Sequence, residues 1–216
     1  DTKISQSTSF PYYFNISQDK ELTFTPTINY GGGVDSSQRF NFDYNQIVSG
    51  GFLKTNLTVD STFENQNSDK WLKEGSLVNN LNTNINEKFN LNISSALQTS
   101  KDYIQQVSPN DDLSYASSLT SSMEINGYNL NKIDDRLMIN ISTYQINQNN
   151  EDNKTIPTIL PYLTYNTGNY ELKKQIRYSN NYEFYNIFRD TPTDIHSKSQ
   201  RKIASTISLN KETINY

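Results

Sequence analysis

The chain has 216 residues, of which only 33% are hydrophobic, and its formal net charge is -4. Acidic and basic residues are interspersed without runs, which argues against the basic face that a nucleic-acid partner requires. The chain has no cysteine, which excludes disulfides and cysteine-based zinc sites, and no apolar run is long enough for a membrane-spanning helix.

The first two predicted strands each contain a proline. Residues 10–17 and 22–30 alternate aromatic or aliphatic side chains with polar ones, which predicts β-strands. Pro11 and Pro26 lie inside these segments. Because proline has no N–H to donate to a ladder, it is normally confined to edge strands, strand starts or bulges. The two prolines therefore predict a sheet edge that pairs weakly, and edge strands of an ordinary sandwich are the alternative.

The same alternation continues along the rest of the chain. In residues 39–45, for example, Phe40, Phe42 and Tyr44 alternate with polar residues. With the first two strands we expect about ten or eleven in total, several of them long enough to cross a bilayer at a tilt. The further strands are predicted at 39–45, 52–60, 77–85, 89–98, 115–125, 136–144, 160–166, 170–178 and 202–210.

The polar face of these strands is composed mainly of Asn, Ser, Thr and Gln, with few charges. A soluble sandwich also alternates, but its outward face carries mixed charge. An amide- and hydroxyl-rich face suits the wet interior of a barrel whose apolar face contacts lipid. The predicted fold class is therefore all-β, an antiparallel transmembrane β-barrel meander that takes up residues 1–216 with no second domain.

No constellation of residues predicts catalysis. His196 is the only histidine, it lies in a predicted loop, and the chain has no G-x-S-x-G elbow. The pairs Asp111-Asp112 and Asp134-Asp135 offer carboxylates, but neither has the spacing of a calcium loop. We therefore expect no enzymatic activity, no cofactor and no metal.

Residues 10–30, FPYYFNISQDKELTFTPTINY, closely resemble the start of the barrel in the LPS-assembly outer-membrane protein family, LptD, also called the organic-solvent-tolerance family. That family typically shows P-Y-Y-x-N-I, a short turn with an acidic residue, and a strand ending in T-P. Less specific similarities follow at 39–44, 112–116 and 156–163.

The resemblance implies a barrel of about 26 strands preceded by a periplasmic jellyroll. The chain would then be a fragment, the N-terminal portion of the barrel, in the outer membrane of a Gram-negative bacterium. Lipopolysaccharide would leave sideways between the first and last strands. The partners implied are lipopolysaccharide, an LptE-type lipoprotein plug in the lumen, outer-membrane lipids, and the periplasmic Lpt bridge through the jellyroll.

The resemblance also assigns Pro11 and Pro26 to the lateral gate, since they match the two prolines of the family's first and second strands. In lipid, water cannot replace a missing ladder bond, so prolines beside the seam would lower the cost of opening it. Four residues of the first strand are the candidates for the lipopolysaccharide exit: Phe10, Tyr12, Tyr13 and Phe14.

Two other functions are also compatible with this sequence. One is a general porin or ligand-gated outer-membrane transporter, which would need clustered charges at a constriction. The other is a secreted β-sandwich module that binds glycans through Asn and Tyr, with its apolar face turned inward.

Overall fold

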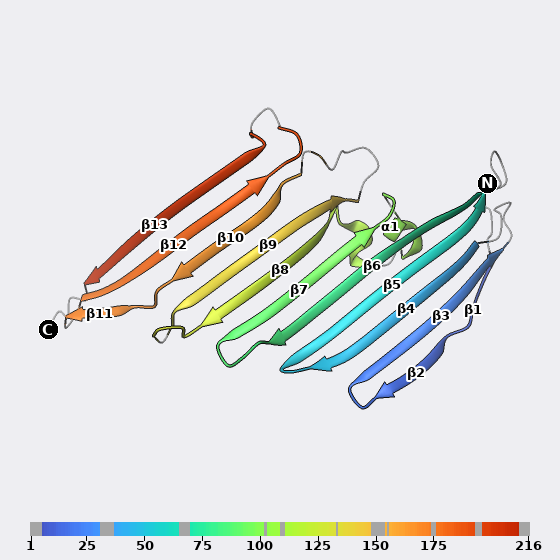
Figure 1. Ribbon diagram of the computed structural model, residues 1–216, viewed down its shortest axis with the longest axis horizontal. Coiled ribbons are helices and arrows are strands. Elements are labelled where there is room, and N and C mark those ends of the chain that lie inside the picture. Colours follow the sequence, from blue (N-terminus) through green and yellow to red (C-terminus); the bar gives the residue numbers. More distant parts are fainter. Residues whose placement is uncertain are drawn as a thin grey trace. The chain divides into compact units, whose positions relative to one another are not determined.

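The computed structural model describes residues 6–30, 37–64, 70–101, 103–108, 111–132, 134–147, 154, 156–173, 176–192 and 196–211. These residues form one antiparallel sheet, open rather than closed (Figure 1). The described part is thus all-β, as predicted, and it contains one sheet instead of the two packed sheets of a sandwich. None of its helices has the length and apolarity needed to cross a membrane.

The sheet contains 13 strands. In chain order they are β1 (Gln6–Ser9), β2 (Tyr12–Ser17), β3 (Lys20–Tyr30), β4 (Ser37–Val48), β5 (Gly51–Glu64), β6 (Lys70–Asn84), β7 (Phe89–Gln98), β8 (Ser118–Tyr128), β9 (Arg136–Ile146), β10 (Thr158–Asn166), β11 (Tyr170–Lys173), β12 (Ile176–Phe188) and β13 (Ser199–Lys211).

The strand number differs from the expected ten or eleven because two positions in the sheet are each shared by two short strands. Both β1 and β2 pair with the side of β3 that faces away from β4. Likewise β10 and β11 pair with the side of β12 that faces away from β13. The 13 strands therefore occupy eleven positions, and apart from these two interruptions the sheet is the meander that the alternation predicts.

One predicted strand contains a reversal of direction. Residues 170–178 were expected to form a single strand, but the structure divides them between β11 and β12, which pair antiparallel with Tyr170 opposite Tyr178. Apolar residues occupy positions 170, 172, 176 and 178, so the same alternation holds on both sides of Lys174, and neither Gly nor Pro marks the reversal. The alternation alone therefore conceals the turn.

The strand predicted at 115–125 begins later, at Ser118, because the residues before it form a helical turn. A short 3-10 helix, η1 (Asp112–Tyr115), is capped by Asp111, whose side chain accepts a hydrogen bond from the backbone N–H of Leu113. A second short helix, α1 (Tyr103–Val107), lies between the strands predicted at 89–98 and 115–125.

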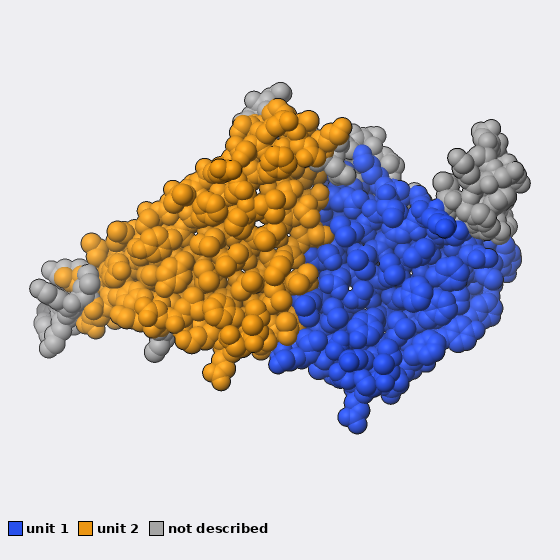
Figure 2. Space-filling model, in the orientation of Figure 1, with its two compact units in different colours: residues 1–81, 94–119, 145–151 blue, residues 82–93, 120–144, 152–216 orange. Residues whose placement is uncertain are grey.

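The chain divides into two compact units (Figure 2). Unit 1 comprises residues 1–81, 94–119 and 145–151, and unit 2 comprises residues 82–93, 120–144 and 152–216.

In unit 1 one face of the sheet is apolar across four strands. Tyr12, Phe24, Phe42 and Leu57 lie opposite one another in register from β2 to β5. The ring centroids of Phe24 and Phe42 are 4.8 Å apart. Such cross-strand aromatic pairs stabilise a sheet by roughly 0.2–1 kcal/mol each.

The opposite face of these strands is polar and hydrogen-bonded within itself. Arg39 donates to Asp60 from Nε at 3.0 Å and from Nη2 at 2.9 Å. Asn41 donates to the hydroxyl of Thr58 at 3.0 Å. The alternation predicted for β4 and β5 is therefore confirmed.

The buried apolar core of unit 1 is small. Its members among the described residues are Ala96, Tyr103, Ile104, Leu119 and Ile146. Three of them, Ala96, Ile104 and Leu119, form one cluster, with Val78 and Leu113 packed against it. The helix α1 is held there by a side chain of β7, because Gln98 accepts a hydrogen bond from the backbone N–H of Ile104 at 3.0 Å.

Candidate functional site

The candidate gate lies at an interrupted strand at one end of the strand order. β1 and β2 follow one another along β3 (Figure 1). Ser9 lies opposite Thr27 and Tyr12 opposite Phe24, so the register is the same on both sides of the interruption. The prediction that Pro11 lies inside the first strand is wrong: Pro11 is in the gap between β1 and β2.

The backbone hydrogen bonds show what Pro26 removes. The N–H of Phe10 donates to the carbonyl of Pro26 at 3.0 Å. In an antiparallel ladder, a residue pair that makes one such bond normally makes the return bond as well. Pro26 has no N–H, so the carbonyl of Phe10 receives no donor from β3. The missing bond therefore weakens the pairing of the first strand with β3.

The ladder between β3 and β4 is unaffected by the same proline. Pro26 lies opposite Phe40 of β4. Because hydrogen-bonded and non-hydrogen-bonded pairs alternate, and the backbone of Pro26 faces the first strand, its pair with Phe40 is a non-hydrogen-bonded one.

Pro11 acts on the other side of the first strand. The position of Pro11 follows that of Phe10, so its backbone nitrogen faces away from β3. Among the described residues, β1 and β2 pair with no strand other than β3. The two prolines were expected to weaken the same seam. The geometry instead places Pro11 on the outer edge and Pro26 on the inner ladder.

The four predicted exit residues lie together at this edge and are exposed, with 49% to 62% of their surfaces accessible. Tyr12 lies on the apolar face, where its ring centroid is 6.4 Å from that of Phe24. By strand alternation, Phe10 and Phe14 share that face. Tyr13 lies on the polar face, and its hydroxyl donates to Glu21 at 2.8 Å.

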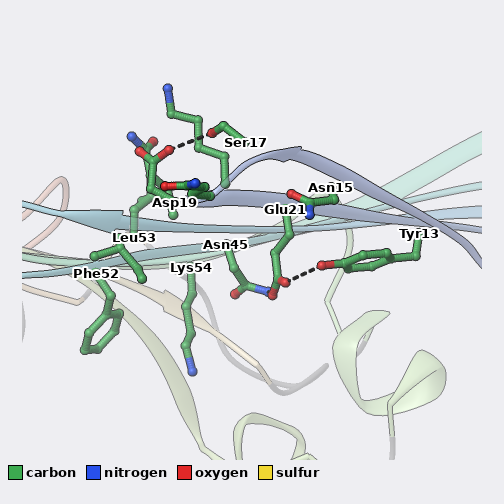
Figure 3. Close-up of a pocket in the computed structure, with 13 residues that line it drawn as sticks. Tyr13, Asn15, Ser17, Asp19, Glu21, Asn45, Phe52, Leu53 and Lys54 are labelled. Carbon is green, nitrogen blue, oxygen red and sulfur yellow. Dashed lines mark hydrogen bonds between the residues drawn. The ribbon is translucent and has the colours of Figure 1, made fainter.

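A pocket of about 400 Å³ lies beside this edge, at the turns that join β2 to β3 and β4 to β5 (Figure 3). Glu21 is central to its polar side, because one carboxylate oxygen accepts from Tyr13 at 2.8 Å and the other from Asn45 at 3.1 Å. Lys54 of β5 lies in register with Asn45. The sequence did not single out Glu21, Asn45 or Lys54, because only the strand register brings them together.

The turn between β2 and β3 carries a second carboxylate, Asp19. The hydroxyl of Ser17 donates to it at 2.6 Å. This hydrogen bond holds the pKa of Asp19 below its usual value. The described residues contain no group of three or more His, Asp or Glu side chains that could share a metal ion.

Unit 2 contains the second interrupted strand, and there the gap is filled. Between β10 and β11, the N–H of Thr167 donates to the carbonyl of Asn180 at 2.8 Å. The N–H of Gly168 donates to the carboxylate of Asp135 at 2.9 Å. The hydroxyls of Tyr165 and Tyr170 also donate to this carboxylate, at 3.2 Å and 3.0 Å.

Asp135 is fully buried. Burial acts to raise the pKa of its carboxyl, but the hydrogen bonds from the backbone of Gly168 and Lys132 and from the two tyrosine hydroxyls outweigh it, so that the pKa lies below its usual value. The ammonium of Lys132 also lies 4.0 Å from the centroid of the Tyr170 ring. Asp135 is therefore an ionised structural group that holds the interruption closed.

No model of a known protein family matches this chain, and a search of curated proteins finds no match either.

Proposed function

We propose that this chain forms the N-terminal wall and gate of a laterally opening outer-membrane β-barrel that transports lipopolysaccharide to the outer leaflet. The observation that carries the proposal is the interrupted first strand. Each side of this strand lacks one ladder hydrogen bond, because Pro11 has no N–H to donate toward the outer edge and Pro26 of β3 has no N–H to donate to Phe10.

The composition of the two faces supports a membrane location. From β2 to β5 one face presents aromatic and aliphatic side chains, whereas the other presents amides, hydroxyls and paired charges. A barrel wall between lipid and an aqueous lumen requires this division. The resemblance of residues 10–30 to the LPS-assembly family supports the choice of lipopolysaccharide as the substrate.

The prolines raise the fraction of molecules in which the gate is open. Each missing ladder bond is worth about 1 kcal/mol. The two bonds belong to different ladders, so parting the first strand from either neighbour is eased by about 1 kcal/mol, which changes the open population of a two-state gate by roughly fivefold. Removing the prolines would therefore keep the gate closed without unfolding the wall.

The first test changes both Pro11 and Pro26 to Ala in the complete protein in cells. We expect the appearance of newly made lipopolysaccharide at the surface to slow, while the amount of folded protein stays the same. Unchanged export would contradict a gating role for the prolines.

The second test places a photocrosslinking amino acid at Tyr12, with Leu57 as the matched control. Both residues lie on the apolar face, but Leu57 belongs to β5, which has a paired strand on each side. Pulse-labelled lipopolysaccharide should be captured at Tyr12 during export and not at Leu57. Equal capture at the two positions would contradict an exit path for lipopolysaccharide at this edge.

A further inference from the structure

We propose that the pocket at the β2–β3 and β4–β5 turns is a binding site for a neutral, hydroxyl-rich saccharide. The proposal rests on the proposed function for the source of that saccharide, the carbohydrate part of lipopolysaccharide.

A row of polar side chains crosses four strands at this pocket. Asn15 lies opposite Glu21, Glu21 opposite Asn45, and Asn45 opposite Lys54. Register places these side chains on the polar face. Figure 3 shows Glu21, Asn45 and Lys54 on one side of the sheet, together with Tyr13.

The row offers both donors and acceptors to a ligand. Each oxygen of Glu21 accepts one hydrogen bond within the protein, from Tyr13 or from Asn45, which leaves further acceptor capacity on the carboxylate. Lys54 carries three N–H donors, and the amides of Asn15 and Asn45 carry both kinds of group. Saccharide hydroxyls donate and accept at once, so a mixed row of this kind suits them.

Aromatic rings flank the polar row. Tyr13 stands on one side and is 62% exposed, and Phe52 stands near the opposite end and is 46% exposed. Phe52 lies at the start of β5, on a face of that strand that is otherwise polar. The ammonium of Lys54 lies 5.5 Å from the centroid of the Phe52 ring. The C–H face of a pyranose ring can pack on such exposed rings while its hydroxyls reach the polar row.

The charges of the pocket favour a neutral ligand. On the polar side, the carboxylate of Glu21 and the ammonium of Lys54 offset one another, whereas Asp19 and Ser17 lie on the other side of the sheet (Figure 3). The carboxylate of Glu21 would repel an anion, and the ammonium of Lys54 would repel a cation. An apolar ligand would bury polar groups without hydrogen-bond partners. The volume of about 400 Å³ belongs to the whole pocket, which residues from both sides of the sheet line.

The experiment measures binding by saturation-transfer NMR to the complete protein in detergent micelles. The probes are the lipid-free oligosaccharide that mild acid releases from lipopolysaccharide, dephosphorylated and carboxyl-reduced so that it is neutral, and maltohexaose as an unrelated neutral glycan. We expect the released oligosaccharide to bind, with its signal transferred from the aromatic protons of the protein.

Two substitutions of the same kind localise the site. Asn45→Ala removes an amide that lines the pocket, and Asn41→Ala removes one from the same strand and the same face that does not line it. Asn45→Ala should weaken binding about tenfold, and Asn41→Ala by less than about twofold. Phe52→Leu gives an independent variant if Asn45→Ala fails to fold, and it should lose the aromatic transfer signal.

The outcomes separate this site from the gate. Binding of the released oligosaccharide that is weakened by Asn45→Ala supports the site. Equal binding of maltohexaose would show that the site also accepts glycans unrelated to lipopolysaccharide. Absence of binding by both probes, equal losses in Asn45→Ala and Asn41→Ala, or displacement by inorganic phosphate would overturn it. Lipopolysaccharide capture at Tyr12 without oligosaccharide binding would support the gate and contradict a saccharide site in the pocket. Oligosaccharide binding with equal capture at Tyr12 and Leu57 would support the saccharide site and contradict the gate.

Discussion

The sheet contains two interrupted strands, and they differ in what fills the interruption. Between β1 and β2, Phe10 and Pro11 lie at an exposed edge, and Pro26 leaves the carbonyl of Phe10 without a ladder donor. Between β10 and β11, the buried carboxylate of Asp135 accepts hydrogen bonds from Gly168 and from two tyrosines.

This difference shows that an interruption in a strand is not by itself a weak point. Backbone groups that lose their ladder partners are costly only when nothing else satisfies them. At the interruption between β10 and β11 the N–H of Thr167 donates to the Asn180 carbonyl and that of Gly168 to the Asp135 carboxylate, so we expect it to be as rigid as a continuous strand. The interruption at β1 and β2 has no equivalent support from the described residues, so we expect it to open first.

The largest expected effect is the loss of the support at the second interruption. Asp135→Asn replaces an acceptor-only carboxylate with an amide that turns an NH₂ group toward several donors. We expect the free energy of unfolding to fall by about 3 kcal/mol, since buried donors lose charged acceptors. Urea unfolding in detergent micelles, followed by circular dichroism, measures the change.

The neighbouring aspartate provides the matched control for this substitution. Asp134 is exposed and has a φ of 72°, a conformation that Asn tolerates. Asp134→Asn should change stability by less than about 0.5 kcal/mol. Similar losses in the two variants would show that Asp135 does not hold the interruption closed.

Acid should weaken the same support progressively. The pKa of Asp135 in the folded protein lies below the ordinary value of 3.8. Its ionised form therefore stabilises the fold at pH values above the unfolded pKa, and this contribution is lost as the pH falls through the folded pKa. The stability difference between the native protein and Asp135→Asn should be constant above about pH 5 and shrink below about pH 4. A difference that does not change with pH would contradict an ionised Asp135.

The smallest effect is expected at the first interruption, where a bond can be added. Pro26→Ala supplies the missing N–H toward Phe10, worth about 1 kcal/mol, although greater freedom in the unfolded chain opposes it by roughly 0.4–1 kcal/mol. Local hydrogen exchange is therefore the better measurement. The amides of Phe10 and Tyr12 should exchange about fivefold more slowly.

Pro11→Ala is the control for Pro26→Ala. Its new N–H would face away from β3, so the exchange of Phe10 and Tyr12 should not change. Equal protection in the two variants would show that the bond directions inferred for this edge are wrong.

Much of the fold follows from the sequence, because alternation with a period of two is a local signal. It located β3, β4, β7 and β9 to within a few residues and divided β4 and β5 correctly into polar and apolar faces. It did not reveal that β11 reverses into β12, since the same alternation holds on both sides of Lys174 and neither Gly nor Pro marks the reversal.

The candidate site could be predicted only in part. Pro11 and Pro26 are visible in the sequence because their chemistry is unusual within strands. The direction in which each missing N–H points depends on ladder phase, which the bond from Phe10 to Pro26 establishes. The pocket residues Glu21, Asn45 and Lys54 come from three strands, and no local pattern encodes their register.

The unchanged register across the first interruption has a consequence for how this edge can evolve. Phe10 and Pro11 occupy two ladder positions, so replacing either one leaves every side chain of β1 on its present face. Deleting one of them would exchange the two faces of β1. The strength of pairing at this edge can therefore change through single substitutions at Pro11 or Pro26, whereas insertions and deletions there would be selected against.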